Sequence, residues 1–175
     1  MISNLLKKKA TDIKLVVLDV DGVLSDGKLY FSANGDELKS FNIMDGLGIK
    51  MLMRNGITVA IITGRTSPLT ERRARDLGIP HLIQGREDKL VALSELCQQL
   101  GISLENTAYM GDDLPDLSAI RAVNLGVCVP NGNAFVQKHA DWVTTREGGY
   151  GAVRELTDLI LSAQGLLEGI HESYL

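Results

Sequence analysis

The chain has 175 residues, a formal net charge of −4 and 45% hydrophobic residues. These values are typical of one soluble globular domain, and the acidic balance argues against a protein that wraps nucleic acid through bulk positive charge. The longest purely apolar runs, such as Leu15–Leu18, have four residues, which is too short to span a membrane.

The N-terminal sequence and the two cysteines indicate the compartment and the kind of cross-links to expect. Lys7–Lys9 is not followed by an apolar leader segment, so we expect a cytoplasmic protein with a solvated N-terminus. Cys97 and Cys128 lie far apart without a C-x-x-C pattern, which argues against zinc and disulfide frameworks.

Along the chain, apolar runs that predict buried strands alternate with amphipathic patterns that predict helices. We expect strands at 13–18, 57–62, 81–83, 107–110 and 125–129. We expect helices at 45–54, 68–77, 87–100 and 153–170, and Gly165 favours a break in the last of them. This alternation is typical of a parallel sheet covered on both faces. We therefore predict one three-layer, Rossmann-like α/β domain over residues 1–175.

One segment departs from this alternation. Residues 28–31 and 37–41 flank Asn34-Gly35, a pair with a strong preference for hairpin turns. The sequence thus predicts a β-hairpin flap over about residues 27–42, inserted after the first strand. Because an isolated two-stranded hairpin is marginally stable in water, we expect the flap to contact another subunit.

Residues suited to phosphate chemistry follow the predicted strands. They are Asp19, Asp21, Thr63, Gly64, Asp112 and Asp113, with Lys89 early in the helix after the third strand. Because the carboxyl ends of parallel strands meet at one edge of a sheet, we expect these groups to lie close together. Clustered carboxylates repel each other unless a cation such as Mg²⁺ offsets their charge. Hydroxyl, amide and ammonium donors suit phosphate oxygens, so the set predicts Mg²⁺-dependent phosphoryl transfer with a carboxylate nucleophile.

The same segments resemble the motifs of the haloacid dehalogenase superfamily of phosphotransferases. They are DVDGVLSDG (19–27), IITGR (61–65), Lys89 and GDDLPD (111–116), in the order of the superfamily. The intervals between the first three are filled by the predicted hairpin, helices and one short strand, which leaves no room for a large cap domain. The resemblance therefore implies a capless member, whose open site is covered by a large substrate or by a neighbouring subunit.

The resemblance also implies a role for each matching residue. Asp19 is implied to be the nucleophile and a metal ligand. Asp21 is implied to be the general acid and base, with its backbone carbonyl on the metal. The implied phosphoryl-binding residues are Thr63, Gly64 and Lys89. Asp112 is implied to be the second carboxylate on the metal. Asp113 is implied to lie behind the direct ligands or to bind the metal through water. We interpret Asp116 as a carboxylate that stabilises the start of a helix.

Within the superfamily, the chain resembles the phosphatases that act on 3-deoxy-D-manno-octulosonate 8-phosphate. The segments that carry this resemblance are NIMDGLGIK (42–50), ITGRTS (62–67), RRARDLGI (72–79), QGREDK (84–89) and GGYGAVRE (148–155). It implies a homotetramer in which the hairpins associate and a neighbour's C-terminal tail, here 165–175, helps to close the site. It also implies a substrate site lined by Asn42, Ile43, Met44, Asp45, Gly46, Lys50, Arg65, Arg73 and Lys89. The implied product feeds lipopolysaccharide synthesis.

Four alternatives remain open. Related phosphatases of 9-carbon sugar acids are expected to carry an acidic residue where this chain has Arg65, which favours the 8-carbon substrate. A phospho-receiver domain would place its acidic pair after the first strand and its phospho-acceptor after the third, the reverse of the order here. A non-catalytic module would be expected to lack Asp19 or Asp21. A phosphomutase needs a closed site, and no cap is visible.

Overall fold

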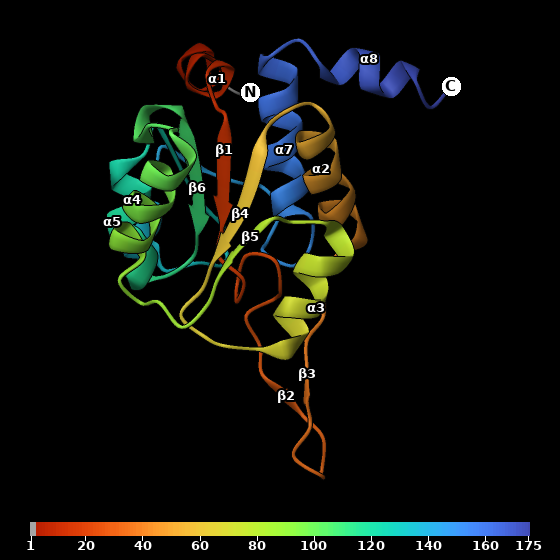
Figure 1. Ribbon diagram of the computed structural model, residues 1–175, viewed down its shortest axis with the longest axis vertical. Coiled ribbons are helices and arrows are strands. Elements are labelled where there is room, and N and C mark those ends of the chain that lie inside the picture. The colour runs from red at the N-terminus through yellow and green to blue at the C-terminus, as the bar shows by residue number, and fades with distance from the viewer. Residues whose placement is uncertain (1–2) are drawn as a thin grey trace.

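The computed structural model describes residues 3–175, and its centre is a six-stranded parallel sheet (Figure 1). The strands are β1 (Leu15–Leu18), β4 (Thr58–Ile62), β5 (His81–Ile83), β6 (Thr107–Gly111), β7 (Leu125–Cys128) and β8 (Trp142–Val143), in the spatial order β5-β4-β1-β6-β7-β8. β1 thus lies between β4 and β6, in the middle of the sheet. The predicted α/β class and the predicted parallel sheet are confirmed.

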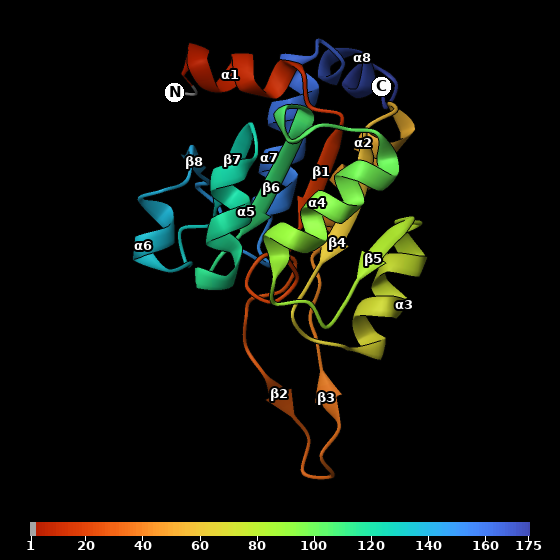
Figure 2. The same cartoon turned by 60° about the vertical axis from the view of Figure 1, so that its left-hand side comes forward.

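Helices cover both faces of the sheet (Figures 1 and 2). They are α1 (Asn4–Thr11), α2 (Ile43–Arg54), α3 (Pro68–Leu77), α4 (Lys89–Leu100), α5 (Leu117–Ala122), α6 (Ala134–Gln137), α7 (Ala152–Ala163) and α8 (Leu167–Glu172), with short 3-10 turns η1 (Leu104–Asn106) and η2 (Leu114–Asp116). One layer is formed mainly by α1, α2 and α7, and the other by α4 and α5. Within residues 3–175, none of these helices has the length and apolarity needed to cross a membrane.

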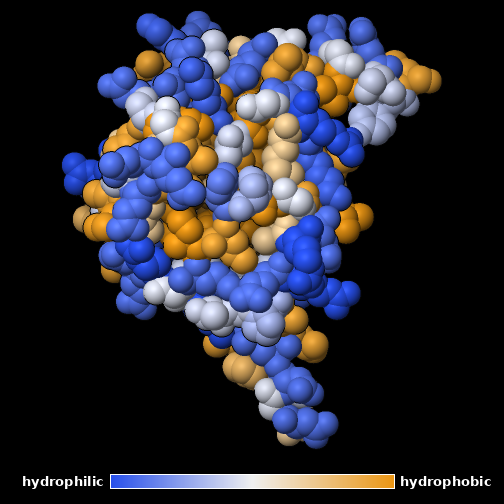
Figure 3. Space-filling view, in the orientation of Figure 1, coloured by the Kyte–Doolittle hydropathy of each residue, from blue (hydrophilic) through white to orange (hydrophobic). Residues whose placement is uncertain are grey.

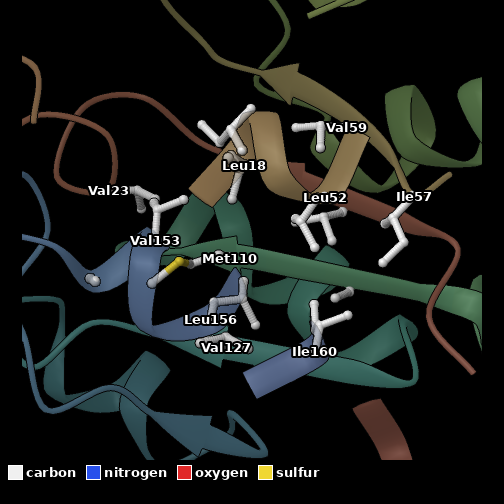
Figure 4. Packing of buried hydrophobic residues seen from close by; sticks show 14 of the residues in the cluster. Leu18, Val23, Leu52, Ile57, Val59, Met110, Val127, Val153, Leu156 and Ile160 are labelled. Atoms are coloured by element: carbon white, nitrogen blue, oxygen red, sulfur yellow. The ribbon is translucent and has the colours of Figure 1, made fainter. Parts of the chain in front are cut away.

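The central strand shows why the sequence folds this way. Every residue of β1 is buried, and its side chains alternate between the two faces of the sheet. Val16 and Leu18 join the core beneath α2 and α7, whereas Leu15 and Val17 join the core beneath α4 and α5. Figure 4 shows Leu18 in the first of these cores, near residues of α2 and α7. A strand that is apolar throughout therefore has to be covered on both sides.

The hairpin leaves the body at the carboxyl end of β1 (Figures 1 and 2). It is formed by β2 (Tyr30–Phe31) and β3 (Glu37–Leu38), and both strands are shorter than predicted. Leu29, Phe31 and Leu38 are all more than half exposed. In Figure 3 this apolar surface is visible on the stem, above a hydrophilic tip. The hairpin thus projects from the body (Figure 1) with apolar side chains left exposed in the isolated chain.

The first and last helices of the chain compare differently with the sequence predictions. The helix predicted over 153–170 breaks at Gly165, whose φ of 72° is the left-handed conformation that favours glycine, and this confirms the prediction. Lys7 and Lys8 are exposed, as expected for a solvated N-terminus, whereas Lys9 is half-buried, and all three lie in the unpredicted helix α1. Leu6 and Ala10 of that helix are buried, and Lys9 Nζ lies 2.6 Å from Asp141 Oδ1. The short elements α5, α6 and β8 were not predicted.

Candidate active site

The predicted functional residues meet at the carboxyl edge of the sheet, around a pocket of about 280 Å³. Asp19 directly follows β1, Thr63 follows β4 and Asp112 follows β6, so three neighbouring strands deliver their next residue to one place. The predicted residues that line the pocket are Asp19, Asp21, Thr63, Gly64, Arg65, Lys89, Asp112 and Asp113. Glu87, Pro115 and Asp116 complete its wall.

Lys89 is the cation at the bottom of this pocket. It is the first residue of α4 and only 4% exposed. Its Nζ lies 3.0 Å from Asp19 Oδ1 and 2.6 Å from Asp116 Oδ1. A buried ammonium group is costly unless it is paired, so the two carboxylates explain why it can be there. They also aim the ammonium group into the pocket beside Asp19.

The carboxylates of the pocket are short of positive charge. Burial, followed by the negative charge of Asp116, raises the pKa of Asp19 to about 7, although Lys89 opposes this. Burial and the charges of Asp19 and Asp116 raise the pKa of Asp112 to about 8. Both shifts show that the protein's own positive charges do not fully offset the negative charge of the ionised carboxylates. A bound divalent cation would supply it.

The same carboxylates fit a metal ion. Asp19, Asp112 and Asp116 each offer an oxygen, and the three oxygens lie within 4.8 Å of one another. Asp116 is already engaged, because Lys89 and the Tyr109 hydroxyl donate to its Oδ1 and the amides of Asp112 and Asp113 donate to its Oδ2. Asp19 and Asp112 are therefore the carboxylates left to hold a cation, and hard oxygen ligands suit Mg²⁺.

Asp116 has a larger role than its sequence position indicates. It forms a capping box with Asp113 in η2, which agrees with the predicted helix-start role. It is also 1% exposed and ties Lys89 to β6 through the Tyr109 hydroxyl, at 2.8 Å. The GDDLPD spacing was the available signal, because it brings a third carboxylate back beside Asp112.

The flap supplies two charged residues that the sequence analysis did not select. Lys39 Nζ forms an ion pair with Asp21 Oδ1, and Glu37 Oε1 lies 3.1 Å from Arg65 Nη2. Arg65 Nη1 is 3.9 Å from Asp21 Oδ2. Both flap residues lie in or just after β3, so the return strand of the hairpin reaches the pocket. Nothing in the local sequence distinguishes them from ordinary hairpin charges.

Close backbone contacts shape the loop that carries Asp19 and Asp21. A Cβ on Gly22 would lie 2.1 Å from Asp112 Oδ2, and a Cβ on Gly148 would lie 1.7 Å from the Gly22 carbonyl oxygen. Glycine is therefore required at both positions. The glycine-rich segment 148–151 packs directly against the loop after β1 and supports it from behind.

The remaining predicted substrate residues lie outside this pocket, around the start of α2. Arg73 Nη2 donates to the Asn42 carbonyl at 2.9 Å, and the guanidinium carbon lies 5.6 Å from the centre of the Phe41 ring. Arg73, Phe41 and Lys39 line an adjacent groove of about 270 Å³. A Cβ on Gly46 would lie 2.5 Å from Arg73 Nη2, so this glycine makes room for the guanidinium group.

Four further residues of α2 differ in their exposure. Ile43 is 82% exposed and Met44 is 44% exposed, while Lys50 is half-buried farther along the helix. Asp45 is 1% exposed and accepts a 2.7 Å hydrogen bond from the Arg154 amide. Burial raises the pKa of Asp45 to about 6. Asp45 thus joins the start of α2 to the start of α7 within the protein interior.

Known proteins are similar to this chain in sequence. Residues 79–155 match the family of haloacid dehalogenase-like hydrolases. The chain is 51% identical over 160 residues to 3-deoxy-D-manno-octulosonate 8-phosphate phosphatase from Escherichia coli strain K12, covering 91% of this chain and 85% of that protein.

Solved structures give the same result. A probable yrbi family phosphatase from Pseudomonas syringae has a TM-score of 0.96 and 55% identity, covering 98% of each chain. The phosphatase from Moraxella catarrhalis, crystallised with magnesium, phosphate and KDO, has a TM-score of 0.96 and 48% identity, covering 98% of this chain and 99% of that one. Similarity at this level over nearly the whole chain confirms the resemblance of the motifs: the chain belongs to the 3-deoxy-D-manno-octulosonate 8-phosphate phosphatase family, among the haloacid dehalogenase-like hydrolases.

Proposed function

We propose that this protein is a Mg²⁺-dependent phosphatase that hydrolyses 3-deoxy-D-manno-octulosonate 8-phosphate to the free sugar acid and phosphate. The observation that carries the proposal is the buried Asp19 carboxylate, held 3.0 Å from Lys89 beside Asp112. The relative that shares this fold at a TM-score of 0.96 was crystallised with magnesium, phosphate and KDO. Both the chemistry of the pocket and the similarity lead to the same substrate class.

The reaction follows from the placement of two carboxylates. Asp19 attacks the phosphorus atom, and the bond to the sugar oxygen breaks as an aspartyl-phosphate forms. Asp21 gives its proton to the leaving sugar oxygen. Asp21 then takes a proton from a water molecule, which attacks the aspartyl-phosphate and releases phosphate and free Asp19. Thr63, the Gly64 amide and Lys89 bind the phosphoryl oxygens during both steps.

Mg²⁺ would be held by the carboxylates of Asp19 and Asp112 and by the backbone carbonyl of Asp21, with Asp113 farther out or binding through water. When bound, the cation offsets the negative charge of the carboxylates and of the phosphoryl group. The raised pKa values of Asp19 and Asp112 support this, because they reflect a site in need of positive charge.

The sugar-acid part of the substrate would lie between the pocket and the groove beside it. Guanidinium groups bind carboxylates in a bidentate manner, which suits Arg65 and Arg73. The proposed lining residues are Asn42, Ile43, Met44, Gly46, Lys50, Arg65 and Arg73. Arg65 favours the 8-carbon acid over a 9-carbon acid. Asp45 would act from behind the site, because it is buried.

We further propose that residues 1–175 form one phosphatase domain that works as a cytoplasmic homotetramer in lipopolysaccharide synthesis. The exposed apolar residues of the hairpin at 27–42 support contacts between subunits. The tail at 165–175 would help to close a neighbour's site. The free thiols of Cys97 and Cys128 suit a reducing compartment. Sedimentation analysis of the intact chain and of a variant truncated after residue 164 would test the assembly.

Phosphate release tests the function directly. The assay compares 3-deoxy-D-manno-octulosonate 8-phosphate with its 9-carbon analogue and with glucose 6-phosphate, in Mg²⁺ and with a chelator. We expect chelator-sensitive release with a strong preference for the 8-carbon acid, and a loss of more than about 10³-fold in kcat for Asp19→Asn. A preference for the 9-carbon ester would show that it, and not the 8-carbon ester, is the substrate. Release from none of the esters would favour a non-catalytic binding module.

A further inference from the structure

Lys39 occupies an unusual position for a lysine on a projecting hairpin. It follows β3, yet its side chain is only 3% exposed. Lysine side chains in hairpins ordinarily extend into water. Burying an ammonium group carries a desolvation cost, which is offset here by the ion pair with Asp21 Oδ1. The side chain is therefore directed from the flap back into the site.

The contact distinguishes the two oxygens of Asp21. Among residues 3–175, Lys39 supplies the only side-chain hydrogen bond to this carboxylate, and it goes to Oδ1. Oδ2 has Arg65 Nη1 at 3.9 Å, which is too far for a hydrogen bond. The Asp21 side chain is 24% exposed and so is not held by close packing. Lys39 thus fixes one oxygen and leaves the other without a hydrogen bond to the described residues.

A second flap residue strengthens this arrangement. Glu37, two residues before Lys39, lies 3.1 Å from Arg65 through Oε1. The return strand of the hairpin therefore holds Asp21 and Arg65 together from the same side. A displacement of the flap would move Lys39, and the Asp21 carboxylate would lose its anchor.

We propose that Lys39 is a positioning residue for the general acid and base: it holds Asp21 by Oδ1 so that Oδ2 gives the proton to the leaving sugar oxygen and later accepts one from water. The inference rests on the proposed phosphatase reaction and adds a residue to it. Lys39 itself does not touch the phosphoryl group in this role. A carboxylate free to rotate would present Oδ2 correctly only part of the time.

The test compares two phosphate esters that differ in their need for a proton. A sugar alkoxide has to be protonated as it leaves, whereas nitrophenolate leaves as the anion. Wild-type protein, Lys39→Met and Lys39→Arg are mixed in excess over 3-deoxy-D-manno-octulosonate 8-phosphate or p-nitrophenyl phosphate, and release of sugar or nitrophenol is followed over the first turnover. Limiting the measurement to the first turnover separates proton donation from the later attack by water. Lys28→Met is the matched control, because Lys28 is an exposed lysine on the outgoing arm of the same hairpin.

For Lys39→Met we expect the first turnover of the sugar phosphate to slow about 10²-fold, and nitrophenol release to change by less than about threefold. Lys39→Arg keeps the charge and should recover most of the lost rate. Lys28→Met should match wild type with both esters. Equal slowing of both esters by Lys39→Met, together with no recovery in Lys39→Arg, would show a merely structural role and overturn the inference.

Failure of the proposed function gives a different pattern. Wild-type protein that releases neither sugar nor nitrophenol would overturn the phosphatase function and this inference with it. An active wild-type protein whose Lys39→Met variant turns over the sugar phosphate normally would overturn the role of Lys39 alone.

Discussion

Lys89 and Asp116 form a buried ion pair in which Nζ lies 2.6 Å from Oδ1 and the two side chains are 5% and 1% exposed. Asp116 also accepts hydrogen bonds from the Tyr109 hydroxyl and from the amides of Asp112 and Asp113. Donors thus surround both of its oxygens, which fixes the carboxylate in place. The cation that faces Asp19 is therefore positioned from behind by a residue that belongs to the next motif along the chain.

The first prediction follows from this pair. Asp116→Ala leaves Lys89 and the Tyr109 hydroxyl without this partner in the interior, so it should lower the free energy of unfolding by about 3–5 kcal/mol. Tyr109→Phe removes only one neutral hydrogen bond and should cost about 1 kcal/mol. Urea denaturation of both variants in a chelator measures these values. A loss below about 1 kcal/mol for Asp116→Ala would contradict the role given to this carboxylate.

The second prediction concerns the metal ion. Burial and the negative charge of neighbouring carboxylates raise the pKa of Asp19 to about 7 and that of Asp112 to about 8, so a cation held between them should stabilise the folded state. At a Mg²⁺ concentration 100 times Kd, the stabilisation should be about 2.7 kcal/mol. Thermal unfolding during a Mg²⁺ titration measures it.

Asp112→Ala should abolish the Mg²⁺-dependent rise in Tm. Asp113→Ala is the matched control and should keep most of the rise, because Asp113 Oδ1 is already bound by the Asn133 side chain at 3.1 Å. An equal rise in Tm in wild type and in Asp112→Ala would show that Mg²⁺ binds at another site.

The fold was largely predictable because the strongest local signals agree with the tertiary structure. The strands are uninterrupted apolar runs, and Ser67, Pro68 and Gly78 mark the ends of α3 as their residue types predict. α1 was missed because three consecutive lysines hide its period, and only Leu6 and Ala10 are buried. Its stability comes from packing on the rest of the core, which no local pattern reports.

The site was predictable only where strand ends determine it. Asp19 and Asp112 follow buried strands, and the order of strands in a parallel sheet brings them together. Lys39 and Asp116 depend on contacts with residues 18 and 27 positions away in the chain. The local sequence around Lys39 is that of an ordinary hairpin charge, and the local sequence around Asp116 is that of a helix-start carboxylate. The chemistry of the pocket could therefore be inferred, but not how its parts are held.

The third prediction concerns pH. The pKa of Asp45 is raised from 3.8 to about 6 by burial, so the folded state holds a proton that the unfolded state loses. Stability from this group is therefore full below about pH 4 and is lost as pH rises through about 6. Asp45→Asn removes this dependence. The free energy of unfolding of the variant, relative to wild type, should thus rise by up to about 3 kcal/mol between pH 4 and pH 7.

Urea denaturation at several pH values measures this difference. The buried carboxylates of the pocket are common to both proteins, so their titration cancels in the comparison. A difference that stays constant from pH 4 to pH 7 would show that Asp45 is ionised throughout, despite its burial.

The last prediction tests the packing behind the nucleophile loop. A Cβ on Gly148 would lie 1.7 Å from the Gly22 carbonyl oxygen and 2.5 Å from its carbonyl carbon, and both are backbone atoms that cannot rotate away. Gly148→Ala should therefore displace the loop that carries Asp19 and Asp21. We expect a loss of at least about 1–3 kcal/mol in stability, and a fall in kcat that exceeds any change in KM.

Gly169→Ala is the control for stability, because its Cβ meets no atom within 4 Å in the part of the chain described and it lies within α8. This substitution should stabilise the protein by up to about 1 kcal/mol. Thermal unfolding of both variants and steady-state kinetics of Gly148→Ala check the prediction, and wild-type kcat in Gly148→Ala would show that the segment 148–151 does not support the catalytic loop.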